Sequence, residues 1–280
     1  MNIQKSVRGI GLIFSKDRAM QLDATLRSLQ FHCSDLCSIQ LTVLYKASTL
    51  AHQEQYHTLI AEHPLVEFIR EIDFKSQVCA ILKNYDFVLF LVDDNLFVRA
   101  FSLEQIVAAM KRSNDILGFS LRLGQNTVYC YPARTSQQLP EFTQHDGLLK
   151  FDWTISELDF AYPLEVSSTL YRVSDLLELL AQLPFSNPNT LEGWLANCKE
   201  LFLAKRYLLC YPYSITFCNP VNKVQHVFAN RAGEDICHSA DELSELFKDG
   251  YRIAIEHYAG FIPNACHQEV KLVFKQEIFF

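Results

Sequence analysis

Residues 87–95 read FVLFLVDDN, six apolar residues followed by two aspartates and an asparagine. A short, continuous apolar run predicts a strand buried on both faces, as in a parallel sheet. Adjacent carboxylates at the exit of such a strand repel each other and lose hydration, and a divalent cation between them relieves both effects. A small set of carboxylate oxygens suits Mn²⁺ or Mg²⁺ that also carries diphosphate oxygens. The sequence therefore predicts a metal site at Asp93 and Asp94, with two solvated turn carboxylates as the simpler alternative.

Other apolar segments precede this strand, and helical patterns separate them. Such alternation predicts an α/β fold with a mostly parallel sheet flanked by helices. Ligands of open α/β sheets bind beyond the carboxyl ends of the strands. Polar residues stand at three of those ends, at 15–18, 46–48 and 93–95. The apolar segments cover residues 9–14, 39–45 and 66–72, and the helical patterns cover 22–29, 52–63 and 75–84.

The pattern loosens after residue 100. Residues 103–112, 170–183 and 191–202 predict helices, and residues 116–123 predict a strand. Residues 129–159 are rich in Pro, Thr, Gln and Asp and predict a loop with little regular structure. A long irregular segment on a rigid sheet is typical of a substrate-binding surface.

We expect a single domain over residues 1–280. Its first part, 1–100, is the expected nucleotide-binding half, and 101–235 is the expected acceptor-binding half. Residues 236–280 are expected to form a C-terminal helical extension, because Ser239 and Glu242 have the spacing of a capping box before an apolar run.

Composition excludes several classes of protein. The formal net charge of −7 argues against a general nucleic-acid binder, which would carry a basic surface. Nine cysteines without a Cys-x-x-Cys pair indicate reduced thiols, so we expect a cytoplasmic protein. No stretch approaches the ~20 apolar residues of a membrane span, and membrane association would be peripheral.

Two motifs resemble those of GT-A glycosyltransferases, especially the enzymes similar to family 2. Residues 90–95, FLVDDN, resemble their Asp-x-Asp element. Residues 13–18, IFSKDR, with Leu22 and Leu26 behind them, resemble their nucleotide-binding first strand and helix. The resemblance covers residues 8 to 100 and is weaker from there to about residue 231. Asn95 stands where the family has a third acidic position, so its amide oxygen would complete a weaker metal site.

The resemblance implies a GT-A fold, with a mixed, mostly parallel sheet flanked by helices. It also implies a metal-assisted transfer of sugar from a nucleotide-sugar donor, with UDP-sugar favoured, to the hydroxyl of a saccharide or another acceptor. In the first loop, Asp17 would accept from a base N–H or a ribose hydroxyl, and the neighbouring cations would face phosphate. An ordinary charged loop before a helix is the alternative. The residues expected to bind the nucleotide are Phe14, Ser15, Lys16, Asp17, Arg18, Ser48 and Asp93.

The acceptor side is expected to come from the second half of the chain. Family members place a carboxylate at the start of a helix beside the acceptor, where it acts as general base, and Glu192 in the sequence NPNTLEGW (187–194) matches this pattern. Asp152 and Glu165 are rival bases. Trp194 and Trp153 would contact sugar, Arg231 would neutralise the leaving diphosphate, and His226 would complete the metal site. The alternatives are a helix-start glutamate, a core tryptophan and a structural histidine.

Two other functions remain open at the level of sequence. A sugar nucleotidyltransferase has a similar fold but would carry a Gly-rich loop after its first strand, and residues 15–18, SKDR, contain no glycine. A catalytically weak or inactive relative that binds sugar or nucleotide is compatible with Asn95. Measuring metal-dependent nucleotide binding and then turnover would distinguish an enzyme from an inactive relative.

Overall fold

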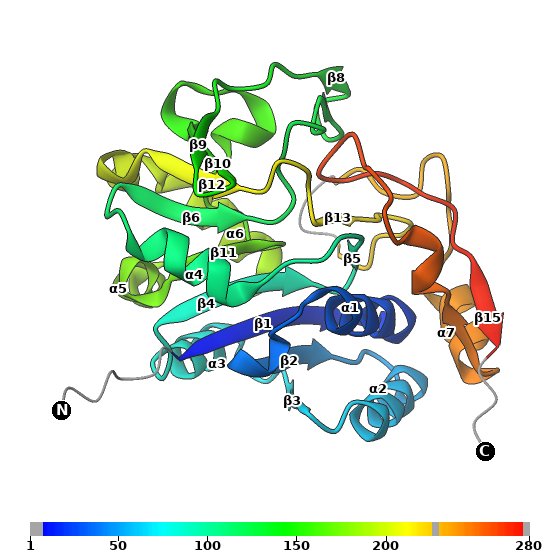
Figure 1. Ribbon diagram of the computed structural model, residues 1–280. Helices are drawn as coiled ribbons and strands as arrows, with labels where there is room; N and C mark the ends of the chain where they lie inside the picture. Colours follow the sequence, from blue (N-terminus) through cyan, green and yellow to red (C-terminus); the bar gives the residue numbers. More distant parts are fainter. Residues whose placement is uncertain (1–7, 226–229, 277–280) are drawn as a thin grey trace.

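The computed structural model describes residues 8–225 and 230–276. Its first half is a parallel sheet in the order β3-β2-β1-β4, and each crossover between strands contains a helix (Figure 1). The predicted alternation of strands and helices is therefore correct over this half. The strands are β1 (Gly9–Lys16), β2 (Ile39–Lys46), β3 (Val66–Arg70) and β4 (Phe87–Val92), and the helices are α1 (Ala19–His32), α2 (Leu50–Glu62) and α3 (Phe74–Leu82).

The same sheet continues into the second half of the chain in the order β4-β11-β6-β12-β10-β9. Strands β11 and β10 are antiparallel to their neighbours, whereas β6 and β12 pair in parallel. The sheet is thus mixed and mostly parallel, which confirms the predicted fold class. The added strands are β6 (Ile116–Ser120), β9 (Thr143–His145), β10 (Leu148–Asp152), β11 (Thr169–Arg172) and β12 (Tyr207–Cys210).

Helices cover both faces of this sheet. Side chains alternate along β4, so that Leu89 and Leu91 join one buried cluster while Val88 and Phe90 join the other. The first cluster includes residues of α1, α2, α4 (Leu103–Lys111) and α7 (Ala240–Lys248), and the second includes residues of α3, α5 (Val173–Gln182) and α6 (Pro188–Asn197). Burial on both faces explains why β4 is apolar throughout.

The middle of the chain has more regular structure than predicted. Residues 129–159 were expected to be a loop, but they contain β9 and β10 of the main sheet and a small pair, β7 (Tyr129–Cys130) with β8 (Thr135–Ser136). The helix expected at 170–183 begins only at Val173, because the preceding residues form β11. The helix expected at 191–202 begins earlier, at Pro188, and a 3₁₀ segment (Lys199–Lys205) follows it.

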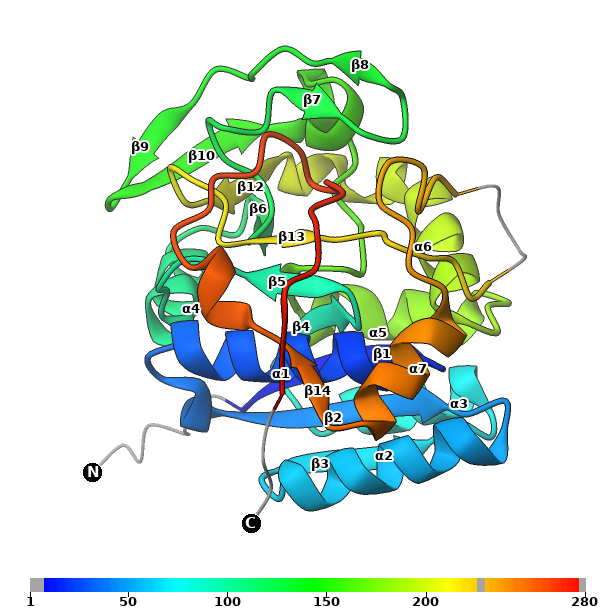
Figure 2. The ribbon, with the colours of Figure 1, turned by 90° about the vertical axis from the view of Figure 1, so that its right-hand side faces the viewer.

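The last segment of the chain packs back onto the first helices (Figure 2). Gln55 of α2 donates to the carbonyl oxygen of Ser244 in α7 at 2.8 Å. The extension expected to be helical contains one α-helix, α7, together with a 3₁₀ turn (Ile255–Tyr258), β14 (Tyr251–Ile253) and β15 (Phe274–Gln276). A further strand, β13 (Thr216–Cys218), pairs with β5 (Asn95–Phe97) directly behind the two aspartates.

Within residues 8–225 and 230–276, no helix has the length and apolar character needed to cross a membrane.

Candidate functional site

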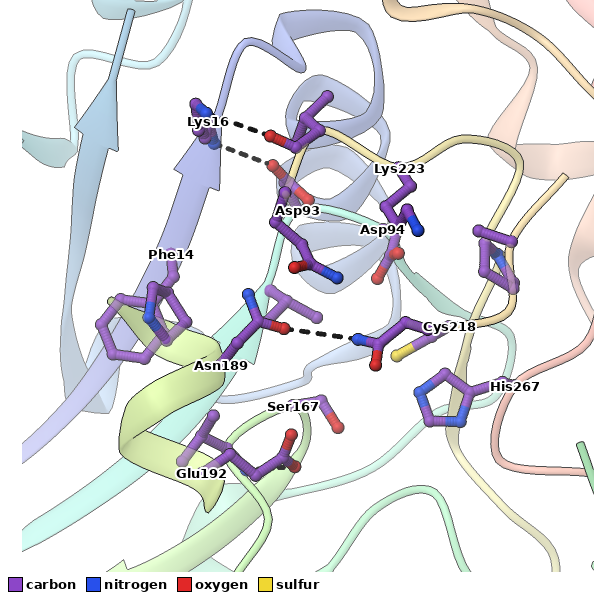
Figure 3. Close-up of a pocket in the computed structure, with 18 of the residues that line it drawn as sticks. Phe14, Lys16, Asp93, Asp94, Ser167, Asn189, Glu192, Cys218, Lys223 and His267 are labelled. Carbon is purple, nitrogen blue, oxygen red and sulfur yellow. Dashed lines mark hydrogen bonds between the residues drawn. The ribbon is translucent and has the colours of Figure 1, made fainter. Parts of the chain in front are cut away.

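A cavity of about 880 Å³ opens at the carboxyl ends of β1 and β4. It is bounded by the ends of these strands, by α6 and by the segment that follows β13 (Figure 3). This is where an open α/β sheet is expected to bind its ligand. Its lining residues include Phe14, Ser15, Lys16, Arg18, Lys46, Asp93, Asp94, Arg122, Glu192, Lys223, Arg231 and His267.

Asp93 and Asp94 face Arg18 at the end of β4. The Nη1 atom of Arg18 lies 3.0 Å from Oδ1 of Asp93 and 3.5 Å from Oδ2 of Asp94. The second oxygen of Asp93 accepts from the backbone N–H of Lys16 at 3.1 Å. Burial and the neighbouring Asp93 raise the pKa of Asp94 to about 6, although Arg18 opposes this shift. The two carboxylates thus form one compact anionic centre with a cation beside it.

Asn95 does not face this centre, so its predicted role as a metal ligand is wrong for this structure. Its side chain is fully buried, with Oδ1 accepting from the backbone N–H of Val92 at 2.9 Å. Its Nδ2 atom lies 3.4 Å from the sulfur of Cys218. The hydroxyl of Thr25 bridges the carbonyl oxygens of Asp93 and Asn95 at 2.9 and 2.8 Å. Asn95 therefore closes the turn that presents the two aspartates.

The first loop divides into residues that line the cavity and residues that hold the loop in place. Phe14, Ser15, Lys16 and Arg18, four of the residues expected to bind the nucleotide, line the cavity. Asp17 does not: it adopts a left-handed backbone conformation, with φ 56°, and its carboxylate accepts from the N–H and the hydroxyl of Ser48, both at 2.7 Å. Asp17 and Ser48 thus tie two loops together, and neither borders the cavity.

One side of the cavity combines apolar and charged groups beyond β1 and β2. Phe14 and Phe74 lie with ring centroids 5.1 Å apart, and Leu44 borders the cavity beside them. Lys46 and Glu71 form an ion pair of 2.9 Å at the same edge. This wall offers a flat ligand an apolar surface next to hydrogen-bonding groups.

Glu192 enters the cavity from α6, opposite the aspartates (Figure 3). The helix begins at Pro188, with Asn187 as N-cap and Thr190 completing a capping box, so Glu192 lies in its second turn. The effect of the helix dipole falls off beyond the first turn. Burial raises the pKa of Glu192 to about 7, with Glu165 adding to the shift and Arg122 opposing it. Glu192 is therefore a carboxylate that can gain or lose a proton near neutral pH.

Glu165 is not available to a ligand. It is buried and accepts hydrogen bonds from Ser167, Ser168 and Thr169, including one of 3.0 Å from the N–H of Ser168. Arg122 lies 3.9 Å from it. Burial alone would raise the pKa of Glu165, but Arg122 and the hydrogen-bond donors hold it below the usual range. Glu165 therefore stays ionised, and its oxygens are occupied by these partners.

Three other predicted residues lie away from the cavity. Asp152 caps a 3₁₀ turn by accepting from the N–H of Thr154 at 2.9 Å, and it also pairs with Arg206. Trp153 is buried and donates from Nε1 to the carbonyl oxygen of Lys205 at 2.9 Å. Trp194 is 40% exposed on another side of α6 and is absent from the cavity lining. The predicted roles of these residues in base catalysis and sugar contact have no support in the geometry.

Arg231 borders the cavity, but its guanidinium is already engaged. It lies 3.9 Å above the ring centroid of Tyr131, and its Nε donates to Glu234 at 2.7 Å. His226, the other late residue predicted for the metal site, falls outside the described residues.

Arg122, Cys218, Lys223 and His267 also line the cavity and were not predicted. Arg122 follows the end of β6, which runs in the same direction as β4, so the rule of strand ends could have found it. Burial and Arg122 lower the pKa of His267 to about 3, which keeps its ring neutral. No spacing in the sequence connects Cys218, Lys223 or His267 to the aspartates, because the chain returns to them only in the folded state.

A group of three acidic or imidazole side chains lies elsewhere. The ligand atoms of Asp23, Glu62 and His63 lie within 4.8 Å of one another, which makes the group a candidate metal site in the described part of the chain. Arg27 donates twice to Asp23, at 2.8 and 2.6 Å, and Arg252 bonds Glu62 at 2.8 Å. The arginine contacts of this group join α1, α2 and β14.

Comparison with known proteins gives one relative in sequence. No protein-family model matches the chain. It is 26% identical to the bifunctional glycosyltransferase pgtA of Dictyostelium discoideum, over 89% of this chain and 36% of that protein. The chain therefore spans little more than a third of the length of this relative. This similarity confirms the predicted kinship with a glycosyltransferase.

Solved structures give weaker likenesses. S. aureus TarS, residues 1–349, is 13% identical with a TM-score of 0.49, over 76% of this chain and 60% of that chain. The mannosyltransferase PcManGT from Pyrobaculum calidifontis, in complex with GDP-Man and Mn²⁺, is 12% identical with a TM-score of 0.39, over 67% of this chain and 51% of that chain.

Proposed function

We propose that this chain transfers a sugar from a nucleoside-diphosphate sugar, with UDP-sugar the first candidate, to the hydroxyl of a saccharide or another acceptor. The observation that carries the proposal is the cavity itself. It sets Asp93 and Asp94 at the end of β4 on one side and Glu192, with a pKa of about 7, on the other. The relationship to a glycosyltransferase supports the same reaction.

The donor would lie across the first half of the sheet, and the acceptor would meet it from the second half. A base and ribose fit the wall of Phe14, Leu44 and Phe74, beside the Lys46–Glu71 pair. The diphosphate would lie near Lys16, Arg18 and Lys223, whose charges balance those of the phosphates. Residues 1–100 would thus hold most of the donor, with Lys223 added at its diphosphate, and residues 101–235 would hold the acceptor.

Asp93 and Asp94 fit a metal that takes few ligands from the protein. Both carboxylates border the cavity, where phosphate oxygens and water would complete the coordination of Mn²⁺ or Mg²⁺. When bound, such a metal would act as a Lewis acid on the diphosphate leaving group. With Asn95 turned away, these two carboxylates are the ligands that we propose.

Glu192 would act as general base. An acceptor hydroxyl is a very weak acid, so its proton must leave as its oxygen bonds to the anomeric carbon. A carboxylate with a pKa near 7 accepts such a proton more readily than one with an ordinary pKa. As the new bond forms, the bond to the diphosphate breaks, and the nearby cations stabilise the charge on the departing group. One base opposite the leaving group favours inversion at the anomeric carbon.

A panel of nucleotide sugars tests the proposed function. The protein is incubated with UDP- and GDP-sugars and MnCl₂, and both thermal stabilisation and release of nucleoside diphosphate are measured. We expect at least one donor to raise the melting temperature and to be hydrolysed slowly without acceptor. Stabilisation without hydrolysis or transfer would favour the inactive, nucleotide-binding relative, and neither effect with any donor would contradict the proposal.

A further inference from the structure

Arg18 occupies the position beside the two aspartates where a cation is expected. Its Nη1 atom lies 3.0 Å from Asp93 and 3.5 Å from Asp94, and its side chain is mostly buried. A guanidinium at these distances neutralises part of the charge that would attract a divalent ion. The same carboxylate oxygens cannot serve Arg18 and a metal equally well.

The segment after β13 holds the guanidinium of Arg18 in this position. Its Nη2 atom donates to the carbonyl oxygen of Asn222 at 2.5 Å, in the segment after β13. Lys16 donates to the carbonyl oxygen of Val224 at 3.0 Å in the same segment. The first loop and residues 222–224 thus hold the guanidinium over the aspartates without any ligand.

Arg18 also has capacity for another partner. Its Nε atom is buried and, among the described residues, has no hydrogen-bond acceptor. Arg18 borders the cavity in which a diphosphate would lie, and guanidinium binds phosphate oxygens in bidentate fashion. A phosphate therefore offers Arg18 an alternative to Asp93 and Asp94.

We propose that Arg18 is a resident cation of the Asp93–Asp94 site, which a divalent metal displaces toward the donor diphosphate. The inference rests on the proposed function, because it takes the metal and the diphosphate as ligands. Metal alone binds weakly, since it must expel Arg18 from its carboxylates. Metal and diphosphate together bind cooperatively, since the diphosphate receives Arg18 as the metal takes its place.

Mn²⁺ binding, measured by the electron paramagnetic resonance signal of free Mn²⁺, tests this inference without any turnover. The wild type, Arg18→Gln and Arg206→Gln are titrated with MnCl₂, first alone and then with saturating UDP. Arg206→Gln is the matched control, because it makes the same chemical change at an arginine that pairs with Asp152 and does not line the cavity. Circular dichroism and thermal unfolding check that each variant is folded, and Arg18→Met repeats the test should Arg18→Gln unfold.

We expect Arg18→Gln to bind Mn²⁺ alone about tenfold or more tighter than the wild type, because a unit charge about 4 Å from the metal is removed. Arg206→Gln should remain within about twofold of the wild type, because its charge is paired with Asp152 outside the cavity. Adding Asp94→Asn to Arg18→Gln should abolish the gain, which locates the ion. UDP should strengthen Mn²⁺ binding more in the wild type than in Arg18→Gln.

Equal or weaker Mn²⁺ affinity in Arg18→Gln would overturn the inference. If the wild type still binds Mn²⁺ with UDP in that case, the metal site of the proposed function stands and only the role of Arg18 fails. If no protein binds Mn²⁺ with or without UDP, the inference fails together with the proposed metal, while hydrolysis of nucleotide sugars tests the rest of the proposed function separately.

Discussion

Glu192 illustrates how one residue acquires reactivity from its surroundings. It is partly buried in the cavity wall, and its carboxylate oxygen accepts from the N–H of Val166 at 3.3 Å. Glu165 lies close enough to disfavour its charge, and Arg122 lies close enough to favour it. The outcome, a pKa near 7, is that of a general base suited to neutral pH.

Replacing Glu192 by Gln keeps the shape of the side chain and removes its basicity. We expect the rate of sugar transfer to fall about a hundredfold or more, because a general base contributes ~10²–10⁴-fold. Affinity for donor, measured by calorimetry with UDP, should hardly change. Glu178→Gln, on the exposed surface of α5, is the control and should behave as the wild type. A variant that binds UDP poorly would instead make Glu192 a binding residue.

The pH dependence of transfer follows from the raised pKa of Glu192. The base must be ionised, so below a pH of about 7 the rate should fall tenfold per pH unit as the carboxylate takes up a proton. Above this pH the rate should level off. The charged or titratable groups that interact electrostatically with Glu192 include Arg122, Glu165, Tyr162 and Tyr171. The residual rate of Glu192→Gln should not show this fall below a pH of about 7. If the fall persists in the variant, it comes from the protonation of another group.

The turn between β4 and β5 explains the unusual third position of the acidic motif. Asn95 both accepts a hydrogen bond from Val92 and points an N–H at Cys218, and aspartate can do only the first. The turn between β4 and β5 therefore needs an amide side chain at position 95 for its own hydrogen bonds. Metal binding is left to the two preceding carboxylates.

Asn95→Asp should destabilise the protein rather than improve its metal site. The change places an unpaired charge at a fully buried position, which typically costs ~1–3 kcal/mol or more. We expect the melting temperature to fall by several degrees in calorimetry. Asn84→Asp, at an exposed position, makes the same chemical change and should leave it nearly unaltered. Wild-type stability with tighter Mn²⁺ binding would show that Asn95 faces the ion after all.

The sequence could predict the elements whose pattern is local. Apolar runs gave β1, β2 and β4 because these strands are buried on both faces, and α3 follows its helical spacing. Strand β10 was not predicted. It pairs antiparallel with β9 and β12, and β12 lies more than fifty residues further along the chain. Strand β11 has four residues and runs directly into α5, so its pattern merges with the helix.

At the scale of the whole molecule, one sheet built from both halves of the chain brings distant residues together. The rule of strand ends pointed to Lys16, Arg18, Asp93 and Asp94, and resemblance to a family pointed to Glu192; all five line the cavity. Lys223 and His267 reach the cavity through the path of the chain after β13, which no local pattern encodes. Asp152, Trp153 and Trp194 have the right chemistry but point elsewhere, because sequence does not give side-chain direction within irregular segments.

Turnover of UDP-sugar by the wild type, Asp94→Asn and Asp249→Asn, with Mn²⁺ and with chelator, tests the central claim most directly. Asp249 is exposed at the end of α7 and serves as the control. We expect the wild type and Asp249→Asn to release UDP at equal rates with Mn²⁺ and to stop with chelator. Asp94→Asn should be slower by about a hundredfold or more, because several kcal/mol of charge stabilisation are lost. Metal-dependent release by Asp94→Asn at the wild-type rate would contradict the account.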